Sequence, residues 1–246
     1  MVYSGKTVSV VLPTYNEKDS IRTTIRAFES LGIVDEIIVV NNNAADGTSA
    51  EVAPTMAREV FEPVQGYGAA IKRGFREAIG DYVCLCEPDG TFEARDILKL
   101  LAYVEDVDIA YGSRTVHEFI WHGANMGFFL RFGNWSVAKL MEVLFNTNSL
   151  SDVGCTMRVA RRSALDVILP HLTVDGSHFG PQMMCVSVIA RLRIVQIPVN
   201  YRSRVGSSSV TGDLWVAAKL GVTMIGLILG YRLRARALRR AIQSPA

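Results

Sequence analysis

The turn Glu87-Pro-Asp-Gly-Thr91 holds the two residues of this sequence whose type and spacing most clearly suit chemistry. Its carboxylates, Glu87 and Asp89, lie two residues apart and directly follow an apolar run that is typical of a buried strand. Two carboxylates at a strand end can both reach one hard cation, and such a cation also binds diphosphate oxygens. We therefore predict that Glu87 and Asp89 bind Mg²⁺ or Mn²⁺, with a plain acidic turn as the alternative.

Two further polar segments follow other apolar runs, and their side chains suit a nucleotide. They are Pro13-Thr-Tyr-Asn-Glu17 and Asn41-Asn-Asn-Ala-Ala-Asp-Gly-Thr48. Amide groups can donate to and accept from a base edge, and a carboxylate can hold ribose hydroxyls. Asn, Asp and Gly also favour ordinary turns. The occurrence of two such segments on adjacent predicted strands is what favours a ligand.

The segment Gly66-Tyr-Gly-Ala-Ala-Ile-Lys-Arg-Gly74 places glycines where a helix is expected to begin. It lacks the GxGxxG pattern of dinucleotide sites. Its glycine spacing suits a backbone that closely approaches a ligand or another element. We predict that Gly68 and Lys72 contact the ligand, with a tight turn before a helix as the alternative.

Four arginines lie at positions that suit two phosphate groups. Arg114 follows a predicted strand, Arg131 lies in an aromatic stretch, and Arg202 and Arg204 flank a Gly-Ser loop whose backbone N–H groups also suit an anion. Each arginine alone is equally typical of a solvated surface charge. Together they predict a leaving diphosphate near Arg114 and a second phosphate near Arg131, Arg202, Arg204 and Ser207.

These segments need a scaffold that brings strand ends together, and the first 110 residues have its pattern. Apolar runs at 8–12, 35–40, 58–61, 81–86 and 107–111 alternate with helical segments, which is typical of a parallel sheet with right-handed crossovers. In such sheets, ligands bind beyond the carboxyl ends of the strands. We therefore expect the residues after the first, second, fourth and fifth runs to share one cleft.

The second half of the chain is more apolar. Residues 117–150 are rich in aromatic side chains, and residues 214–231 are apolar except for Lys219. Five arginines without an acid follow within 232–246. The apolar segment is marginal in length for a spanning helix and fits an interfacial helix at an anionic membrane better. A helix packed into the core is the alternative.

Composition excludes several classes of protein. Apolar residues make up 49% and charged residues 20%, which argues against disordered, collagen-like and disulfide-rich chains. The net charge of +2 is too small to favour nucleic acid. The four cysteines form no zinc-type set and predict buried thiols in a reducing compartment. Without a signal-peptide pattern, we expect a cytoplasmic protein held peripherally at the membrane, with a catalytic domain at 1–212 and a C-terminal helix at 213–246.

In the order of its segments, the sequence resembles family 2 nucleotide-sugar glycosyltransferases with a GT-A fold, especially the polyprenyl-phosphate branch that includes dolichyl-phosphate mannosyltransferase. The resemblance covers roughly residues 7–210. The shared motifs are PTYNE, the loop ending in DGT, GYGAAIKRG, the DxD-like acidic turn, YGSR, Ser151-Asp-Val-Gly-Cys-Thr-Met-Arg158, Arg161-Arg162, Ile197-Pro-Val-Asn-Tyr-Arg202 and Arg204-Val-Gly-Ser-Ser208. Three positions depart from that branch: Glu87 replaces an Asp, Thr91 stands where Gln is frequent, and Asn41-Asn42 replaces an acidic pair. They leave open whether the donor is a UDP-sugar or a GDP-sugar.

The resemblance implies an α/β fold with a mostly parallel, Rossmann-like sheet flanked by helices. It implies inverting transfer of a sugar from a nucleotide diphosphate sugar to polyprenyl phosphate. We then expect the nucleotide sugar at Pro13, Tyr15, Glu17, Asn41, Asn42, Gly68, Lys72, Glu87 and Asp89. We expect catalysis from Asp89, Arg114, Arg131 and Arg202.

The identity of the acceptor follows from a missing acid. A hydroxyl acceptor needs a general base, which family members that use hydroxyls supply in the segment that is Phe179-Gly-Pro-Gln-Met-Met184 here, and this segment has no acid. A phosphate acceptor is already anionic and needs none. Asp152 is a fallback base and His178 a weaker one. A hydroxyl-directed soluble glycosyltransferase and a non-catalytic nucleotide-sugar-binding relative remain alternatives.

Overall fold

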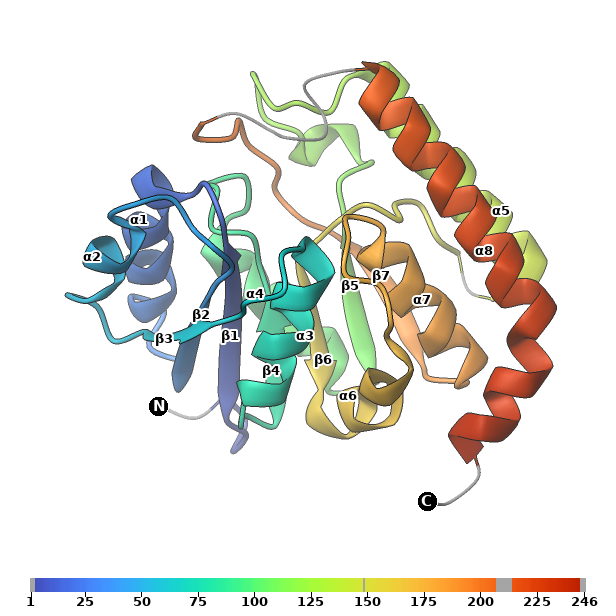
Figure 1. The fold of residues 1–246 in the computed structure, drawn as a ribbon, viewed down its shortest axis with the longest axis horizontal. Coiled ribbons are helices and arrows are strands. Elements are labelled where there is room, and N and C mark those ends of the chain that lie inside the picture. The colour runs from blue at the N-terminus through green and yellow to red at the C-terminus, as the bar shows by residue number, and fades with distance from the viewer. Residues whose placement is uncertain (1–2, 148, 207–213, 244–246) are drawn as a thin grey trace.

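The computed structural model describes residues 3–147, 149–206 and 214–243, and these form a seven-stranded mixed sheet between helical layers (Figure 1). The strands are β1 (Val8–Thr14), β2 (Glu36–Asn41), β3 (Arg58–Phe61), β4 (Tyr82–Leu85), β5 (Ile109–Ser113), β6 (Arg158–Arg161) and β7 (Ile194–Pro198). The α-helices are α1 (Lys18–Glu29), α2 (Thr48–Val52), α3 (Tyr67–Glu77), α4 (Ile97–Val104), α5 (Phe128–Phe145), α6 (Arg162–Ile168), α7 (Phe179–Ile189) and α8 (Leu214–Gln243). The 3-10 helices are η1 (Ala94–Asp96), η2 (His117–Phe119) and η3 (Leu169–His171).

The strand order is β3-β2-β1-β4-β6-β5-β7, and every neighbouring pair is parallel except those that involve β6. The predicted mostly parallel α/β sheet is therefore confirmed. The sequence did not predict β6, which runs antiparallel between β4 and β5. It has only four residues, with an arginine at each end. Its burial comes from pairing on both edges rather than from an apolar run of its own.

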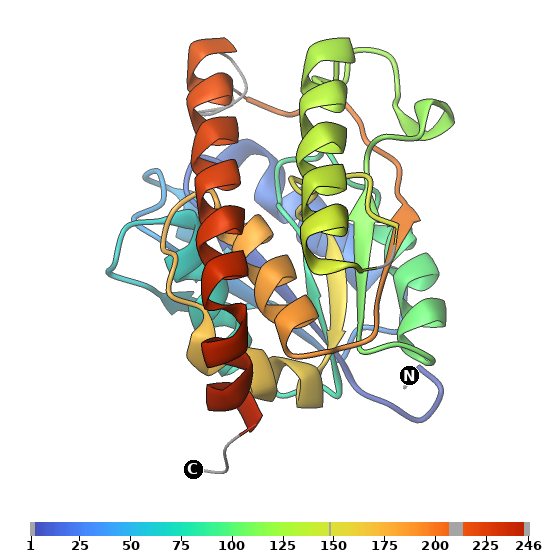
Figure 2. The same ribbon diagram turned by 90° about the vertical axis from the view of Figure 1, so that its right-hand side faces the viewer.

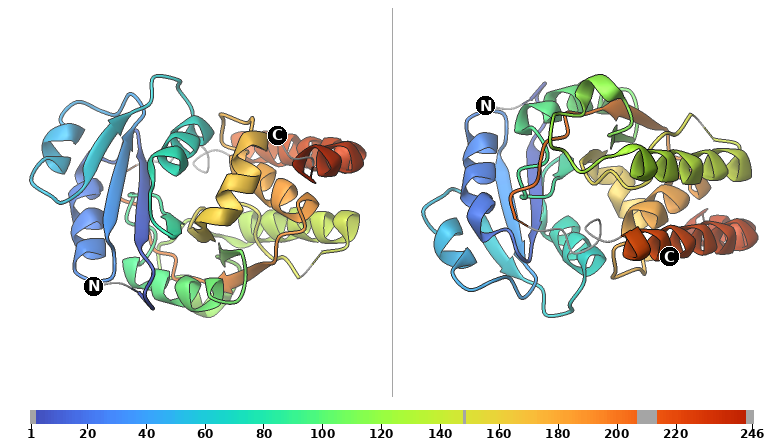
Figure 3. Two further views of the ribbon diagram at one scale, coloured as in Figure 1. Left: turned by 90° about the horizontal axis from the view of Figure 1, so that it is seen from below. Right: turned by 90° about the horizontal axis from the view of Figure 1, so that it is seen from above.

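The central strands are buried on both faces because helices cover both sides of the sheet (Figure 3). Successive side chains point to opposite faces. On β1, Val11 contributes to a core shared with α3, α7 and α8, whereas Val10 and Leu12 contribute to a core shared with α1 and α4. The four cysteines are buried free thiols in these layers, as predicted.

The two longest helices, α5 and α8, lie side by side on the outside of the domain (Figure 2). Four side chains of α8 are buried against α5 and α7, namely Met224, Ile228, Tyr231 and Ala235. The opposite face of α8 remains exposed and carries Trp215, Val222, Ile225, Leu229 and Leu233. From Trp215 to Gln243, α8 is long and apolar enough to cross a membrane by length and composition, and 17% of its most apolar window is buried.

The five arginines of residues 232–246 lie within α8, which continues to Gln243. Both α5 and α8 begin at the end of the molecule toward which β1 runs, and α8 ends near the opposite edge (Figures 1 and 2). Its last turns, with Ala235 buried and Arg239 donating to the carbonyl of Ile189, pack on the domain. The predicted boundary between 212 and 213 lies outside the described residues.

Candidate active site

Strands β1, β2, β4 and β5 run in the same direction, so their carboxyl ends share one edge of the sheet (Figure 1). The residues after β1 and β4 meet there, because Glu17, Glu87 and Asp89 all approach the guanidinium of Arg204. Pro13 is buried within β1, and Tyr15 is half exposed at the strand's end. Side chains that follow β1 and β4 thus meet at the carboxyl edge, where ligands bind in sheets of this kind, and the predicted shared cleft stays a prediction.

Asp89 is the fully buried carboxylate of the acidic turn. Its Oδ1 accepts hydrogen bonds from the backbone N–H (2.9 Å) and the hydroxyl (2.6 Å) of Thr91, which fix its orientation. Its Oδ2 is buried and accepts no hydrogen bond from the described residues, although Nη2 of Arg204 lies 2.6 Å away. A buried carboxylate oxygen is costly unless a cation balances it, as the guanidinium of Arg204 does here and as a metal ion would. Asp89 therefore fits a metal ligand, and Thr91 orients it.

Glu87 is the second acid of this turn. Burial and the nearby charge of Asp89 raise the pKa of Glu87 to about 7, while Arg204 and Arg114 oppose the shift. In the part of the chain that the structure describes, no group of three or more His, Cys, Asp or Glu side chains suits a metal. Mg²⁺ commonly uses one or two carboxylates plus substrate phosphates. The pair of acids therefore fits a cation that is shared with a bound diphosphate.

The loops around the predicted nucleotide site are held by side chains that bond to backbone. Oε2 of Glu17 accepts the N–H groups of Tyr15 (2.7 Å) and Asn16 (2.9 Å). Oδ1 of Asn41 accepts the N–H of Ala44 (2.8 Å). These contacts order the ends of β1 and β2 before any ligand binds.

Asn42 holds the loop that follows β3 through its side-chain amide. Its buried Nδ2 donates to the carbonyls of Glu62 and Val64, both at 2.8 Å, and its Oδ1 accepts from the N–H of Gly66 (2.8 Å) and from Gln65 (3.2 Å). Both amide hydrogens and the amide oxygen are therefore used inside the protein. These bonds support the loop at 62–66, and a contact of Asn42 with the base stays a prediction.

Gly68 and Lys72 on α3 both meet the segment around Asp175. A Cβ at Gly68 would lie 2.3 Å from the carbonyl oxygen of Val174, so only glycine permits this approach. The N–H of Gly68 donates to the carbonyl of Asp175 (2.7 Å), and Nζ of Lys72 pairs with its carboxylate (2.6 Å). This packing explains the glycine, and a contact of either residue with nucleotide sugar stays a prediction.

Arg114 is held by a buried ion pair with Asp152. The guanidinium donates two hydrogen bonds to this carboxylate, at 2.9 and 3.1 Å, and the backbone N–H of Arg114 donates a third at 2.9 Å. Burial alone would raise the pKa of Asp152, but the charge and hydrogen bonds of Arg114 hold it below its usual range. Asp152 is fully buried, so it positions Arg114 rather than serving as the fallback base.

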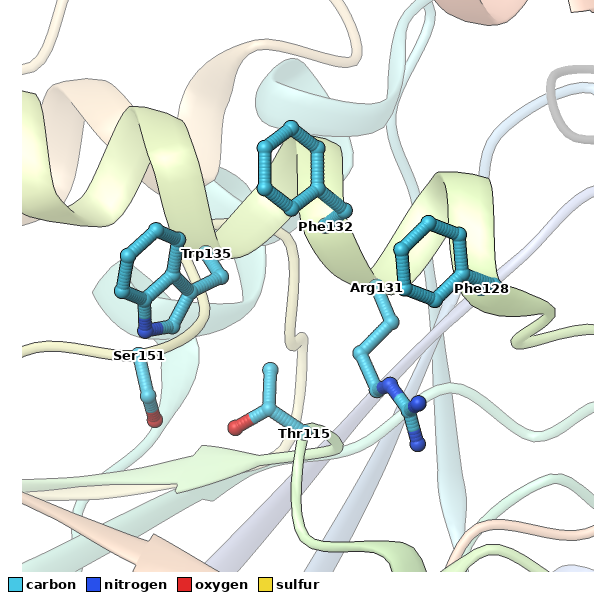
Figure 4. Close-up of a pocket in the computed structure, with 6 residues that line it drawn as sticks. All are labelled: Thr115, Phe128, Arg131, Phe132, Trp135 and Ser151. Atoms are coloured by element: carbon cyan, nitrogen blue, oxygen red, sulfur yellow. The ribbon is translucent and has the colours of Figure 1, made fainter.

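Arg131 lines a cavity of about 350 Å³ together with Thr115, Phe128, Phe132, Trp135 and Ser151 (Figure 4). The rings of Phe128, Phe132 and Trp135 form a stacked row along α5, with neighbouring centroids 6.0 and 6.1 Å apart. The guanidinium of Arg131 extends from α5 toward the loop of Thr115. The cavity therefore combines one cation and two hydroxyls with an aromatic wall that is largely exposed to solvent.

The other two arginines lie in different surroundings. Arg202 forms an ion pair with Glu93 and lies 4.2 Å from the ring centroid of Trp121. Arg204 lies at the acidic turn, and Ser207 is outside the described residues. The structure thus distributes the predicted phosphate ligands Arg131, Arg202 and Arg204 among three environments instead of one cradle.

Sequence reasoning did not predict the supporting contacts that hold this arrangement together. Buried Asp96 accepts the N–H and the side-chain amide of Asn200 and pairs with Lys99, which anchors the segment before Arg202. Thr91 and Asp152 orient Asp89 and Arg114. The motifs contained most of these residues, but partners that lie 38 positions apart, as Arg114 and Asp152 do, or 104 apart, as Asp96 and Asn200 do, carry no local signal of their pairing.

Comparison with known proteins identifies the family. The "Glycosyl transferase family 2" profile matches residues 9–169. Similar curated proteins include low-salt glycan biosynthesis hexosyltransferase Agl6 of Haloferax volcanii (29% identity over 90% of this chain and 58% of that protein). An uncharacterized glycosyltransferase of Mycobacterium tuberculosis is 31% identical over 86% of this chain and 93% of that protein. Dolichyl-phosphate beta-glucosyltransferase of Saccharomyces cerevisiae is 23% identical over 92% of this chain and 76% of that protein.

Among solved structures, glucosyl-3-phosphoglycerate synthase of M. tuberculosis in complex with Mn²⁺ and UDP matches with a TM-score of 0.70, at 20% identity over 93% of this chain and 80% of that chain. The fold and the family profile define a glycosyltransferase with a GT-A-like fold. The chain belongs to glycosyl transferase family 2. It spans less than two thirds of the length of Agl6.

Proposed function

We propose that this glycosyltransferase moves a sugar from a UDP- or GDP-sugar to polyprenyl phosphate, with inversion of configuration. The observation that carries the proposal is the cavity around Arg131. A guanidinium flanked by hydroxyls suits a phosphate group, and an exposed aromatic row suits an isoprenoid chain. The similarity to dolichyl-phosphate beta-glucosyltransferase supports the same acceptor class.

On the donor side, Glu87 and Asp89 would hold Mg²⁺ or Mn²⁺, which neutralises the departing diphosphate when bound. Arg114, locked by Asp152, adds a fixed positive charge near the same strand ends. The structurally similar glucosyl-3-phosphoglycerate synthase of M. tuberculosis binds UDP with Mn²⁺ or Mg²⁺. Glu17, Asn41 and Tyr15 would line the nucleoside.

The reaction would proceed as one displacement. An oxygen of the acceptor phosphate forms a bond to the anomeric carbon while the bond to the diphosphate oxygen breaks, and the negative charge passes to the diphosphate. No proton has to be removed, so no base is required. This agrees with α7, whose residues 179–184 are buried and contain no acid.

Peripheral membrane association belongs to the same proposal. Phe128, Phe129 and Trp215 are exposed at the beginnings of α5 and α8, beyond the edge where the strands end. Large exposed apolar side chains gathered in one region commonly mark an interaction surface. A membrane that presents polyprenyl phosphate would cover them.

The test is a panel of nucleotide sugars incubated with Mg²⁺ or Mn²⁺ and one of three acceptors: polyprenyl phosphate, 3-phosphoglycerate or a simple alcohol. Products are identified by mass spectrometry, and their anomeric configuration by NMR. Lipid-linked product of inverted configuration is expected. Transfer only to 3-phosphoglycerate or the alcohol would replace the acceptor assignment. Binding of nucleotide sugar without turnover would indicate the non-catalytic alternative, and retained configuration would reject the single displacement.

A further inference from the structure

The guanidinium of Arg204 lies at the meeting point of three carboxylates. Its Nη2 is 2.6 Å from Oδ2 of Asp89 and 3.2 Å from Oε2 of Glu87. Its Nη1 is 3.7 Å from Oε1 of Glu17. One positive charge faces three acids, so the cluster is only partly neutralised and still attracts cations.

The backbone around Arg204 does not depend on this side chain for its position. The N–H of Arg202 donates to the carbonyl of Thr91 (2.8 Å), and the N–H of Val205 donates to the carbonyl of Asp89 (2.9 Å). These two bonds tie the segment to the acidic turn on both sides of Arg204. The side chain is 26% exposed, so it can leave the carboxylates by rotation of its own torsions while the backbone stays in place.

A divalent cation and the Arg204 guanidinium compete for the same oxygen. Mg²⁺ binds carboxylate oxygens at about 2.1 Å, and Nη2 of Arg204 already lies 2.6 Å from the otherwise unbonded Oδ2 of Asp89. Two cationic groups so close to one oxygen would repel each other strongly. Occupancy by one therefore excludes the other.

We propose that Arg204 is the built-in counter-ion of the acidic turn and that a divalent cation must displace it from Asp89. This inference rests on the proposed metal site at Glu87 and Asp89. Metal alone then binds weakly, because it replaces a cation that is already present. Metal with a nucleoside diphosphate binds more tightly, because the diphosphate adds negative charge to the cluster. Arg204 thereby makes metal loading dependent on the donor nucleotide.

The test measures Mn²⁺ affinity by electron paramagnetic resonance, without nucleotide and with UDP or GDP. The variants are Arg204→Gln and, as a control, Arg193→Gln, which removes the same charge from an ion pair with Asp108 at the start of β5. Arg204→Gln should tighten nucleotide-free Mn²⁺ binding about tenfold, and Arg193→Gln should leave it unchanged. Mn²⁺ should also raise the melting temperature of Arg204→Gln more than that of the unmodified protein.

Each further outcome is decisive. Equal nucleotide-free affinities for Arg204→Gln and the unmodified protein overturn the counter-ion role. The metal site itself still stands in that case if Mn²⁺ binding with nucleotide is lost in Asp89→Asn. Absence of Mn²⁺ binding with either nucleotide removes the metal site and the inference together. Arg204→Lys keeps the charge on a side chain with different donor geometry, so its nucleotide-free Mn²⁺ affinity should stay nearer to that of the unmodified protein than to that of Arg204→Gln; an affinity equal to that of Arg204→Gln contradicts the proposal.

Discussion

The donor and acceptor regions of the site are built in different ways. At the ends of β1, β2 and β4, polar side chains are held by hydrogen bonds and ion pairs within the protein, as for Asp89 with Thr91 and Asn42 with the 62–66 loop. Around α5, exposed aromatic rings surround Arg131, for which the described residues show no side-chain hydrogen bond or ion pair.

This difference matches the chemistry expected of two ligands. A nucleotide diphosphate has many polar groups, and a preformed site avoids the cost of ordering loops on binding. An isoprenoid chain has no polar groups to recognise, so apolar surface and one cation for its phosphate suffice. Changes on the donor side should therefore affect turnover, whereas changes on the acceptor side should affect affinity for one substrate.

The largest effect is expected at Asp89. Asp89→Ala removes the buried carboxylate that Thr91 orients and should lower the transfer rate by at least roughly 1,000-fold. Glu87→Ala should cost less, because water can replace a longer, less constrained ligand. Transfer rates and melting temperatures of both variants test this. Near-native activity in a folded Asp89→Ala variant would contradict the assignment of Asp89 as a metal ligand.

Arg114→Ala should lower turnover by roughly 100-fold with little change in either Michaelis constant, since its fixed charge acts on the leaving diphosphate. Asp152→Asn should lower turnover in the same direction, because the neutral amide holds the guanidinium less firmly. Steady-state kinetics with each substrate varied in turn provide the measurement. An increase in the Michaelis constant alone would assign Arg114 to ground-state binding instead.

On the acceptor side, Arg131→Ala should raise the Michaelis constant for polyprenyl phosphate about tenfold and leave that for the nucleotide sugar unchanged. Arg202→Ala should have a smaller effect in the same direction, because Arg202 already pairs with Glu93 and stacks on Trp121. Equal effects on both substrates would place Arg131 at the donor instead.

Membrane affinity provides a further contrast. The double variant Phe128→Ser and Phe132→Ser should weaken binding to liposomes that contain anionic lipid about tenfold or more, because two exposed rings lose apolar contact. Tyr103→Ser changes an exposed ring on α4 and serves as the control. Co-sedimentation measures both. Unchanged binding of the double variant would exclude α5 as the contact surface.

The smallest effect is expected at the arginines of α8. Arg232→Gln with Arg236→Gln should weaken liposome binding at most about fivefold at low salt and not at all at high salt. These exposed residues lie toward the end of α8 that is far from the beginning of α5 (Figure 2). A larger effect than that of the Phe128 and Phe132 double variant would indicate that the arginine-bearing end of α8, and not the beginning of α5, contacts the membrane.

Local pattern alone predicted most of the sheet and the polar loops at its carboxyl edge. Buried strands such as β1 and β2 are continuous apolar runs, and their direction follows from alternation with helices. The acidic turn was found because its acids follow such a run directly. The short strand β6 and the buried face of α8 could not be predicted, since both depend on partners distant in sequence.

The fold class, the family, the position of Glu87 and Asp89, and the absence of an acid at 179–184 all follow from residue type and spacing along the chain. The ion pair of Asp152 with Arg114, the approach of Arg204 to the acidic turn and the place of Arg131 in an aromatic row became visible only in three dimensions. Ion pairs and cavities form between side chains from different elements, so packing selects their partners and neighbouring residues do not.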